Sequence, residues 1–195
     1  MEDLEVDLCI TAAYGQYLPK RFLRAPKFGT LNVHPSLLPL WRGASPVQRS
    51  LEAGDEVTGV SVLFTVTKMD AGPIVAQEER RLEGDETAPE LLMELFEKGT
   101  NLLVDSLPAV FDGSATPSEQ NEEDATAAAK ISKEDAKCDP SVESALAIHN
   151  QARGFAEWPG TWVLLSVDGM PAERFRIART RALPADADGK PAGKE

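Results

Sequence analysis

The sequence has 195 residues, of which 20 are Lys or Arg and 32 are Asp or Glu, so its formal net charge is −12. A hydrophobic fraction of 42% is typical of a chain that buries a core, and it excludes a disordered chain. Two cysteines cannot form a disulfide framework, and without a Cys-x-x-Cys pattern we expect no structural zinc site. The two histidines limit the ways of building a His-based catalytic site. No apolar run approaches the ~18 residues of a membrane-spanning helix, so we expect no membrane partner. The acidic start also differs from a secretory signal peptide.

Positive charge is concentrated near the N-terminus. Residues 8–51 include no acidic residue and six basic ones, whereas residues 52–105 include 13 acidic and 4 basic residues. A basic block in an acidic protein indicates an anionic ligand at that surface. The alternative is that these side chains only keep loops and helix faces in water, and charge alone does not separate the two.

Residue patterns predict an α/β unit over residues 1–112. Apolar and β-branched runs predict strands at 7–13, 29–34, 58–66 and 74–81. We expect the first two strands to be fully buried, and charged residues mark the fourth as an edge strand. Helical segments are predicted at 20–24, at 46–53 before Gly54, and at 87–111, where Thr87 and Glu90 form a capping box. Gly99 is expected to weaken the middle of the longest helix.

The remainder of the chain predicts a linker and a smaller second unit. Residues 113–129 are rich in Ser, Thr, Glu, Asp and Ala, and they lack apolar periodicity, which predicts a linker. The second unit, residues 130–183, is expected to hold a helix at 141–153 capped by Ser141. It also holds a hairpin, with strands at 161–167 and 172–180 around Asp168-Gly169. Residues 184–195 are expected to form a frayed tail.

Residues 32–43 include the side chains best suited to catalysis. Asn32 and His34 are two apart, so they share one face at the carboxyl end of a predicted strand, where α/β sheets bind ligands. Asn32 can donate to an oxygen that becomes negative, while His34 supplies a proton or polarises the same carbonyl. Asp70, in a predicted turn, can orient His34 or hold a water. Each residue taken singly also fits a structural role, as part of a turn with satisfied hydrogen bonds.

The longer pattern resembles the folate-dependent formyltransferases. It comprises Asn-x-His-Pro-Ser-Leu-Leu-Pro-x-x-Arg-Gly at 32–43, Thr-Gly-Val at 58–60 and Asp-x-Gly at 70–72. Within this group the chain is most similar to methionyl-tRNA formyltransferases, because residues 129–136, 150–155 and 158–160 resemble the start of their C-terminal domain. The resemblance implies a partial Rossmann-like formyltransferase domain followed by an incomplete OB-like β-barrel.

The resemblance also implies a role for each matching position. Asn32, His34 and Asp70 would be catalytic, and Arg42 would lie near the acceptor or its phosphates. The implied reaction moves a formyl group from 10-formyltetrahydrofolate to the α-amine of charged initiator tRNA, without a metal. Another amine acceptor, or an inactive folate- or RNA-binding remnant, is the alternative. The implied folate-binding positions are Tyr14, Gly15, Gln16, Tyr17, Leu18, Ser36, Leu37, Leu38 and Pro39.

The chain also departs from that family pattern. The family fold begins with a further βαβ portion, and the barrel pattern stops here after two strands, so we expect a chain truncated at both ends. The net charge of −12 suits tRNA poorly, and only the basic block and four arginines after residue 173 offset it. We expect a monomer, located in a mitochondrion or plastid if eukaryotic and in the cytoplasm if bacterial.

Overall fold

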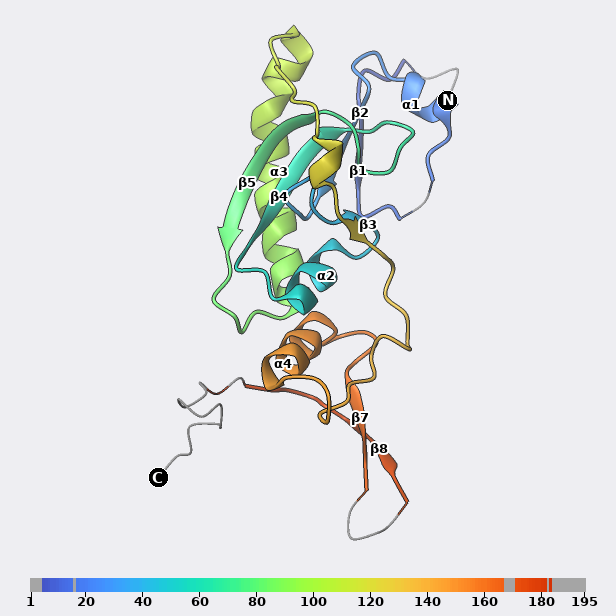
Figure 1. The fold of residues 1–195 in the computed structure, drawn as a ribbon. Helices are drawn as coiled ribbons and strands as arrows, with labels where there is room; N and C mark the ends of the chain where they lie inside the picture. Colours follow the sequence, from blue (N-terminus) through green and yellow to red (C-terminus); the bar gives the residue numbers. More distant parts are fainter. Residues whose placement is uncertain (1–4, 16, 167–170, 182, 184–195) are drawn as a thin grey trace.

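A computed structural model describes residues 5–15, 17–166, 171–181 and 183 (Figure 1). The predicted tail at 184–195 and the predicted hairpin turn at Asp168-Gly169 lie outside the described residues. In chain order the elements are β1 (Cys9–Ala12), α1 (Lys20–Arg24), β2 (Thr30–His34), β3 (Arg42–Gly43), α2 (Pro46–Ala53), β4 (Val57–Phe64), β5 (Ile74–Arg81), α3 (Ala88–Asp112), the 3-10 turn η1 (Glu122–Asp124), β6 (Ala127–Ala128), α4 (Ala145–Gly154), β7 (Trp162–Leu165) and β8 (Glu173–Arg176).

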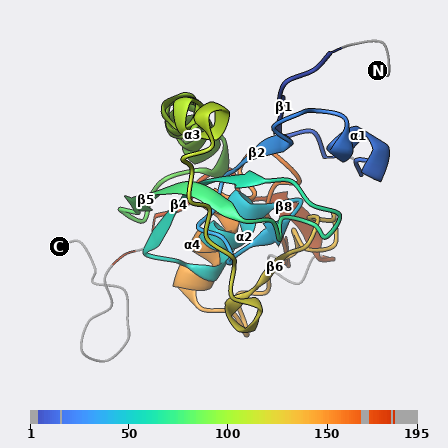
Figure 2. The ribbon, with the colours of Figure 1, turned by 90° about the horizontal axis from the view of Figure 1, so that it is seen from above.

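Four strands form one mixed sheet in the order β1-β2-β4-β5. β1 runs parallel to β2, whereas β4 runs antiparallel to both β2 and β5. The long helix α3 packs along one face of this sheet (Figure 1, Figure 2). The predicted α/β class and the predicted edge position of β5 are therefore confirmed. No described helix combines the length and apolar character needed to cross a bilayer.

β1 is less buried than its apolar sequence predicts. Its residues alternate between half-buried and exposed, and Ile10 is 51% exposed. β1 forms one edge of the described sheet, so a row of its backbone groups has no described strand beside it. The prediction of a fully buried strand is wrong for β1 and close for β2, where four of five residues are buried, because burial depends on the neighbouring elements.

Side-chain alternation along β2 separates the core from the candidate site. Leu31 and Val33 point into the main core, where they join Val60 and Val62 of β4 and the buried face of α3. Asn32 and His34 point to the opposite face of the sheet. The strand pairs Asn32 with Leu63 and His34 with Ser61 across β4. The apolar side chains thus anchor β2 in the core. Asn32 and His34, on the other face, stay free to contact the loop that follows the strand.

Gly99 allows α3 to approach the sheet closely. A Cβ atom built on Gly99 would lie 2.5 Å from Val33 Cγ1 and 2.6 Å from Val60 Cγ2. Such distances are far below van der Waals contact, so only glycine fits without movement of the two valines. The helix continues through Gly99, from the predicted capping box of Thr87 and Glu90 to Gly113.

The second unit packs on the first through α4. This helix lies against α2, and a Cβ on Gly154 would lie 2.9 Å from the Gln48 carbonyl. The N-cap of α4 is Ser144, whose hydroxyl accepts from Ala147 N at 3.1 Å. The predicted cap at Ser141 is wrong, because Ser141 Oγ instead donates to Asp139 Oδ1 in a preceding turn.

β7 and β8 form the predicted antiparallel hairpin. They make a separate two-stranded sheet, and no closed barrel is present in the described part of the chain. The predicted OB-like barrel is therefore not confirmed, and its two predicted strands are shorter than expected. The division of the chain into two domains at residues 113–129 stays a prediction.

The segment predicted as a linker is bound along its length to the first unit. Ser118 exchanges two backbone hydrogen bonds with Ile74 at 2.8 and 2.9 Å. Farther along, β6 pairs in parallel with β3. Polar composition alone does not distinguish a free linker from a segment that satisfies its backbone groups on a neighbouring surface, and here the second case holds.

We predict that Gly99→Ala lowers the free energy of unfolding by about 1–3 kcal/mol, because the added methyl group overpacks the interface with Val33 and Val60. Urea unfolding followed by circular dichroism measures the change. At an exposed helical position the same substitution would stabilise by about 1 kcal/mol. Asn101→Ala, at an exposed position of α3, is the control and should not destabilise. A Gly99→Ala variant that is more stable than the wild type would contradict the close packing of α3 on Val33 and Val60.

Candidate active site

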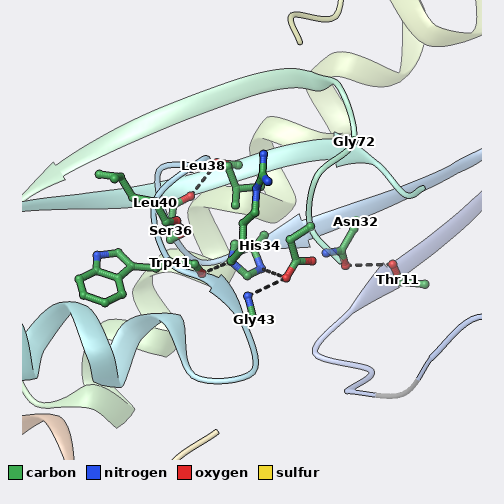
Figure 3. A network of polar contacts seen from close by, with 12 residues as sticks. Thr11, Asn32, His34, Ser36, Leu38, Leu40, Trp41, Gly43 and Gly72 are labelled. Atoms are coloured by element: carbon green, nitrogen blue, oxygen red, sulfur yellow. Dashed lines mark hydrogen bonds and ion pairs between the residues drawn. The ribbon is translucent and has the colours of Figure 1, made fainter. Parts of the chain in front are cut away.

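The parallel strands β1 and β2 end side by side, with Ala12 opposite Val33. Two loops follow these ends, 13–19 after β1 and 35–41 after β2. Asn32 and His34 lie on the same side of β2, as their spacing predicts (Figure 3). The turn that carries Asp70 reaches the same place from the end of β4. The three residues predicted as catalytic are thus brought together.

His34 is 4% exposed and is held by the loop that follows it. Its Nε2 lies 2.9 Å from the Trp41 carbonyl oxygen. A carbonyl only accepts hydrogen bonds, so Nε2 carries a proton. In the neutral ring Nδ1 is then the basic nitrogen, and it lies 3.7 Å from Asp70 Oδ2. Nδ1 is therefore the atom of this ring that can take up a proton.

Asp70 is fixed by its backbone and by an amide donor. Its φ of +48° lies in the left-handed region, which is uncommon for a residue with a side chain. Its Oδ2 accepts a hydrogen bond from Gly43 N at 2.9 Å. Figure 3 shows this bond next to the His34 contact. The carboxylate is thereby held between the Gly43 amide and the imidazole, and it can stabilise a positive charge on the ring.

Asn32 is oriented by β1. Its Oδ1 accepts a hydrogen bond from the Thr11 hydroxyl at 2.9 Å. Within the described residues its Nδ2 amide donates to no acceptor, so two N–H donors stay available to a substrate oxygen. Thr11 is a site residue that the sequence did not indicate, because only the strand pairing places it opposite Asn32.

The loop 35–41 is fastened to β4 and β5 through buried polar groups. Ser61 Oγ donates to the Ser36 carbonyl at 2.6 Å and accepts from Leu38 N at 3.1 Å. Ser36 Oγ donates to the Leu40 carbonyl at 2.6 Å, and Gln77 Nε2 donates to the Leu38 carbonyl at 2.9 Å. The Ser36 side chain and the backbone of Leu38 thus hold the loop by hydrogen bonds, and the buried Leu38 side chain packs on Leu63 and Ile74. Leu37 and Pro39 are half-buried.

The remaining predicted folate positions follow β1. Tyr14 and Tyr17 are 60% and 73% exposed, and Leu18 is half-buried. Gly15 has a φ of +65°, which suits the predicted hinge. Gln16 lies outside the described residues. Tyr14, Gly15, Tyr17 and Leu18 lie at the same end of the sheet as the loop 35–41, and the contact of all five predicted positions with folate stays a prediction.

Arg42 contacts the segment that follows α3. Its Nε and Nη2 donate to Gln120 Oε1 at 2.9 and 2.8 Å, and its Nη1 donates to Glu122 at 3.1 Å. Hydrogen bonds from Lys68 and Arg42 lower the pKa of the Glu122 carboxyl below its usual value. Only 9% of the Arg42 side chain is exposed. Its predicted place near the acceptor stays a prediction, and its observed partners are Gln120 and Glu122.

Comparison with known proteins assigns the family. A family model described as formyl transferase matches residues 1–107, more than half of the chain. The chain belongs to the formyl transferase family. This confirms the family that the pattern at 32–43 predicts. Among the described residues, no group of three or more His, Cys, Asp or Glu side chains is arranged to hold a metal ion.

Solved structures show the same fold at low sequence identity. A sugar N-formyltransferase from Shewanella sp. is 20% identical with a TM-score of 0.70, over 92% of this chain and 71% of that chain. HypX from Aquifex aeolicus, solved with tetrahydrofolic acid, is 19% identical with a TM-score of 0.71, over 82% and 27%. WlaRD, a sugar 3N-formyltransferase solved with dTDP and 5-N-formyltetrahydrofolate present, is 16% identical with a TM-score of 0.63, over 80% and 57%.

These neighbours support the predicted formyl donor but not the predicted amine acceptor. Two of them were solved with a folate, which supports the predicted formyl donor. Two are sugar N-formyltransferases, so they do not support the predicted methionyl-tRNA specificity. They support the alternative, a different amine acceptor, better than the main prediction.

We predict that the neutral His34 ring carries its proton on Nε2, because the Trp41 carbonyl can only accept. ¹H–¹⁵N correlation spectra at about pH 8, where an ordinary imidazole is neutral, should show Nδ1 as the bare nitrogen. A His34→Gln variant assigns the signals, since those of His149 stay. A proton on Nδ1 of the neutral ring would contradict the described geometry.

Proposed function

We propose that the chain transfers a formyl group from 10-formyltetrahydrofolate to a primary amine. The observation that carries this proposal is the convergence of Asn32, His34 and Asp70 at the carboxyl end of β2. Membership of the formyl transferase family supports it, as do the folates in two structural neighbours. The proposed donor lies between the loops that follow β1 and β2, where Tyr14 and Tyr17 are exposed.

The proposed reaction begins with attack of the amine nitrogen on the formyl carbon. His34 Nδ1 takes the proton that the attacking nitrogen loses, because Nε2–H is occupied by the Trp41 carbonyl. The resulting imidazolium lies beside the Asp70 carboxylate, at the 3.7 Å separation of Nδ1 and Oδ2. The opposite charge stabilises the protonated ring while the tetrahedral intermediate exists.

Asn32 acts on the oxygen. The formyl oxygen gains negative charge as the new C–N bond forms, and the Nδ2 amide donates to it. Thr11 holds Oδ1 and so keeps the amide in the donating orientation. The bond from the formyl carbon to the folate nitrogen then breaks, and His34 returns its proton to that nitrogen. Atoms and charges balance without an oxidant or a metal.

Two acceptors are proposed, each on a different observation. An amino group of a nucleotide-linked sugar is favoured by the structural neighbours, two of which are sugar N-formyltransferases. The α-amine of methionyl-tRNA is favoured by the resemblance of residues 129–136 and 150–160 to the C-terminal domain of tRNA formyltransferases. The location in a mitochondrion, a plastid or a bacterial cytoplasm stays a prediction.

We predict that Asn32→Ala and His34→Ala each lower kcat for formyl transfer by about 100-fold to 1,000-fold, since each removes a group that acts in the transition state. The assay follows tetrahydrofolate release with charged initiator tRNA, or with a dTDP-linked amino sugar, as acceptor. Folate binding is measured in parallel by fluorescence titration. Glu97→Ala, at an exposed position of α3, is the control and should transfer at the wild-type rate.

The acceptor that supports turnover decides between the two proposals. Binding of folate without transfer to either acceptor would count against the proposed function and favour an inactive remnant. Variants that keep the wild-type rate would remove Asn32 and His34 from the mechanism.

A further inference from the structure

The segment 118–128, here named the crossing segment, runs over the face of the sheet that carries the candidate site (Figure 1). It starts at β5, where Ser118 pairs with Ile74. It ends beside the loop after β2, where Thr126 Oγ1 accepts from Trp41 N at 2.8 Å and the Ala128 carbonyl accepts from Ala44 N at 2.9 Å. This segment therefore supports the residues whose backbone groups hold His34 and Asp70.

Gln120 makes the most extensive side-chain contact of the crossing segment. Its Nε2 donates to the Asp70 carbonyl at 2.7 Å and to the Gly72 carbonyl at 2.8 Å. Its Oε1 accepts from two nitrogens of Arg42, at 2.9 and 2.8 Å. A primary amide has two N–H donors and two lone pairs on its oxygen, so all four positions are used. One side chain thus joins the Asp70 turn to β3.

The same two segments are joined a second time by the Asp70 carboxylate. Its Oδ2 accepts from Gly43 N at 2.9 Å, and Gly43 follows Arg42 in β3. The Asp70 turn is therefore tied to β3 by its carbonyl, through Gln120, and by its carboxylate directly. Both ties hold the turn against β3, one at the backbone of Asp70 and one at its side chain.

Backbone strain at Asp70 makes the tie through Gln120 important. A φ of +48° costs free energy for a residue with a Cβ atom, so the turn needs outside contacts to stay in this conformation. If the tie through Gln120 is lost, the turn can relax toward an ordinary conformation. Such a relaxation moves the carboxylate away from His34 Nδ1.

We propose that Gln120 is a positioning residue that sets the place of the Asp70 carboxylate beside His34. The proposal rests on the formyl transfer proposed above. Gln120 contacts the backbone of Asp70 and the guanidinium of Arg42, and it acts on the reaction through Asp70. Through Gln120 the crossing segment, whose sequence predicts a linker, helps to build the active site.

The decisive variant is Gln120→Glu. It keeps the shape of the side chain and an acceptor for Arg42, but it removes both donors to the Asp70 turn. If Gln120 only fills space or holds Arg42, this variant behaves as wild type and Gln120→Ala does not. If the donors matter, both variants lose activity. We expect kcat to fall by about 10-fold to 100-fold, with a change of less than about 3-fold in the KM for the formyl donor.

A double variant tests whether Gln120 affects kcat through Asp70. In an Asp70→Asn background, where the carboxylate is already absent, Gln120→Glu should lower kcat no further, because the two residues act through one group. Additive losses would overturn the proposal. Glu119→Gln is the matched control, since it exchanges a carboxylate and an amide at the neighbouring exposed position and should leave kcat unchanged.

A measurement without turnover separates this proposal from the proposed function. The Gly43 amide hydrogen is held by Asp70 Oδ2, so its exchange with solvent should be slow in the wild-type chain. Gln120→Glu should speed that exchange about 10-fold or more, and Glu119→Gln should not. Unchanged exchange in Gln120→Glu overturns the proposal whether or not the chain transfers formyl groups.

Discussion

The hydrogen bond from His34 Nε2 to the Trp41 carbonyl is the contact on which the candidate site depends. It fixes the tautomer of the ring, and with it the nitrogen that faces Asp70. Trp41, which supplies this carbonyl, has a φ of +61°, in the left-handed region. The indole nitrogen supports this conformation by donating to Asp55 Oδ2 at 2.7 Å, and Asp55 Oδ2 also accepts from Ser50 of α2 at 2.7 Å. The tautomer is thus linked to the packing of α2.

The loop after β2 is held from three directions because it satisfies its polar groups on three different elements. Ser61 of β4 binds it from the sheet, and Asp55 binds it from the end of α2. Thr126 binds it from the crossing segment, where its hydroxyl accepts from Trp41 N. Buried backbone groups need such partners, since each unpaired one costs about 1–3 kcal/mol. The same bonds that stabilise the loop also direct its carbonyl and amide groups at His34 and Asp70.

Local patterns predicted the local features of the fold, and long-range pairing accounts for what they missed. Period-two spacing correctly placed Asn32 and His34 on one face, and a capping box correctly placed the start of α3. Gln120 lies 50 residues from Asp70, and nothing in its neighbourhood distinguishes it from a solvated polar residue. Ser141 and Ser144 are both good caps in isolation, and the turn at Asp139 decides between them. The missed site residues were polar side chains whose partners only the tertiary fold supplies.

The charge pattern of the sequence likewise does not reveal which basic side chains pair with acidic ones in the fold. The basic block contains six Lys and Arg residues, but Arg42 pairs with Glu122, and Arg49 pairs with Glu52 and Asp135 at 2.7 and 2.8 Å. Acidic residues from later in the chain balance the charges of Arg42 and Arg49, so these two arginines add little positive potential to the protein surface. The four that keep no acidic partner among the described residues lie at 20–27, on and just after α1. Since α1 follows the loop 13–19, the basic side chains that keep no acidic partner lie beside the loop proposed to bind folate, and they supply the positive potential of the basic block there.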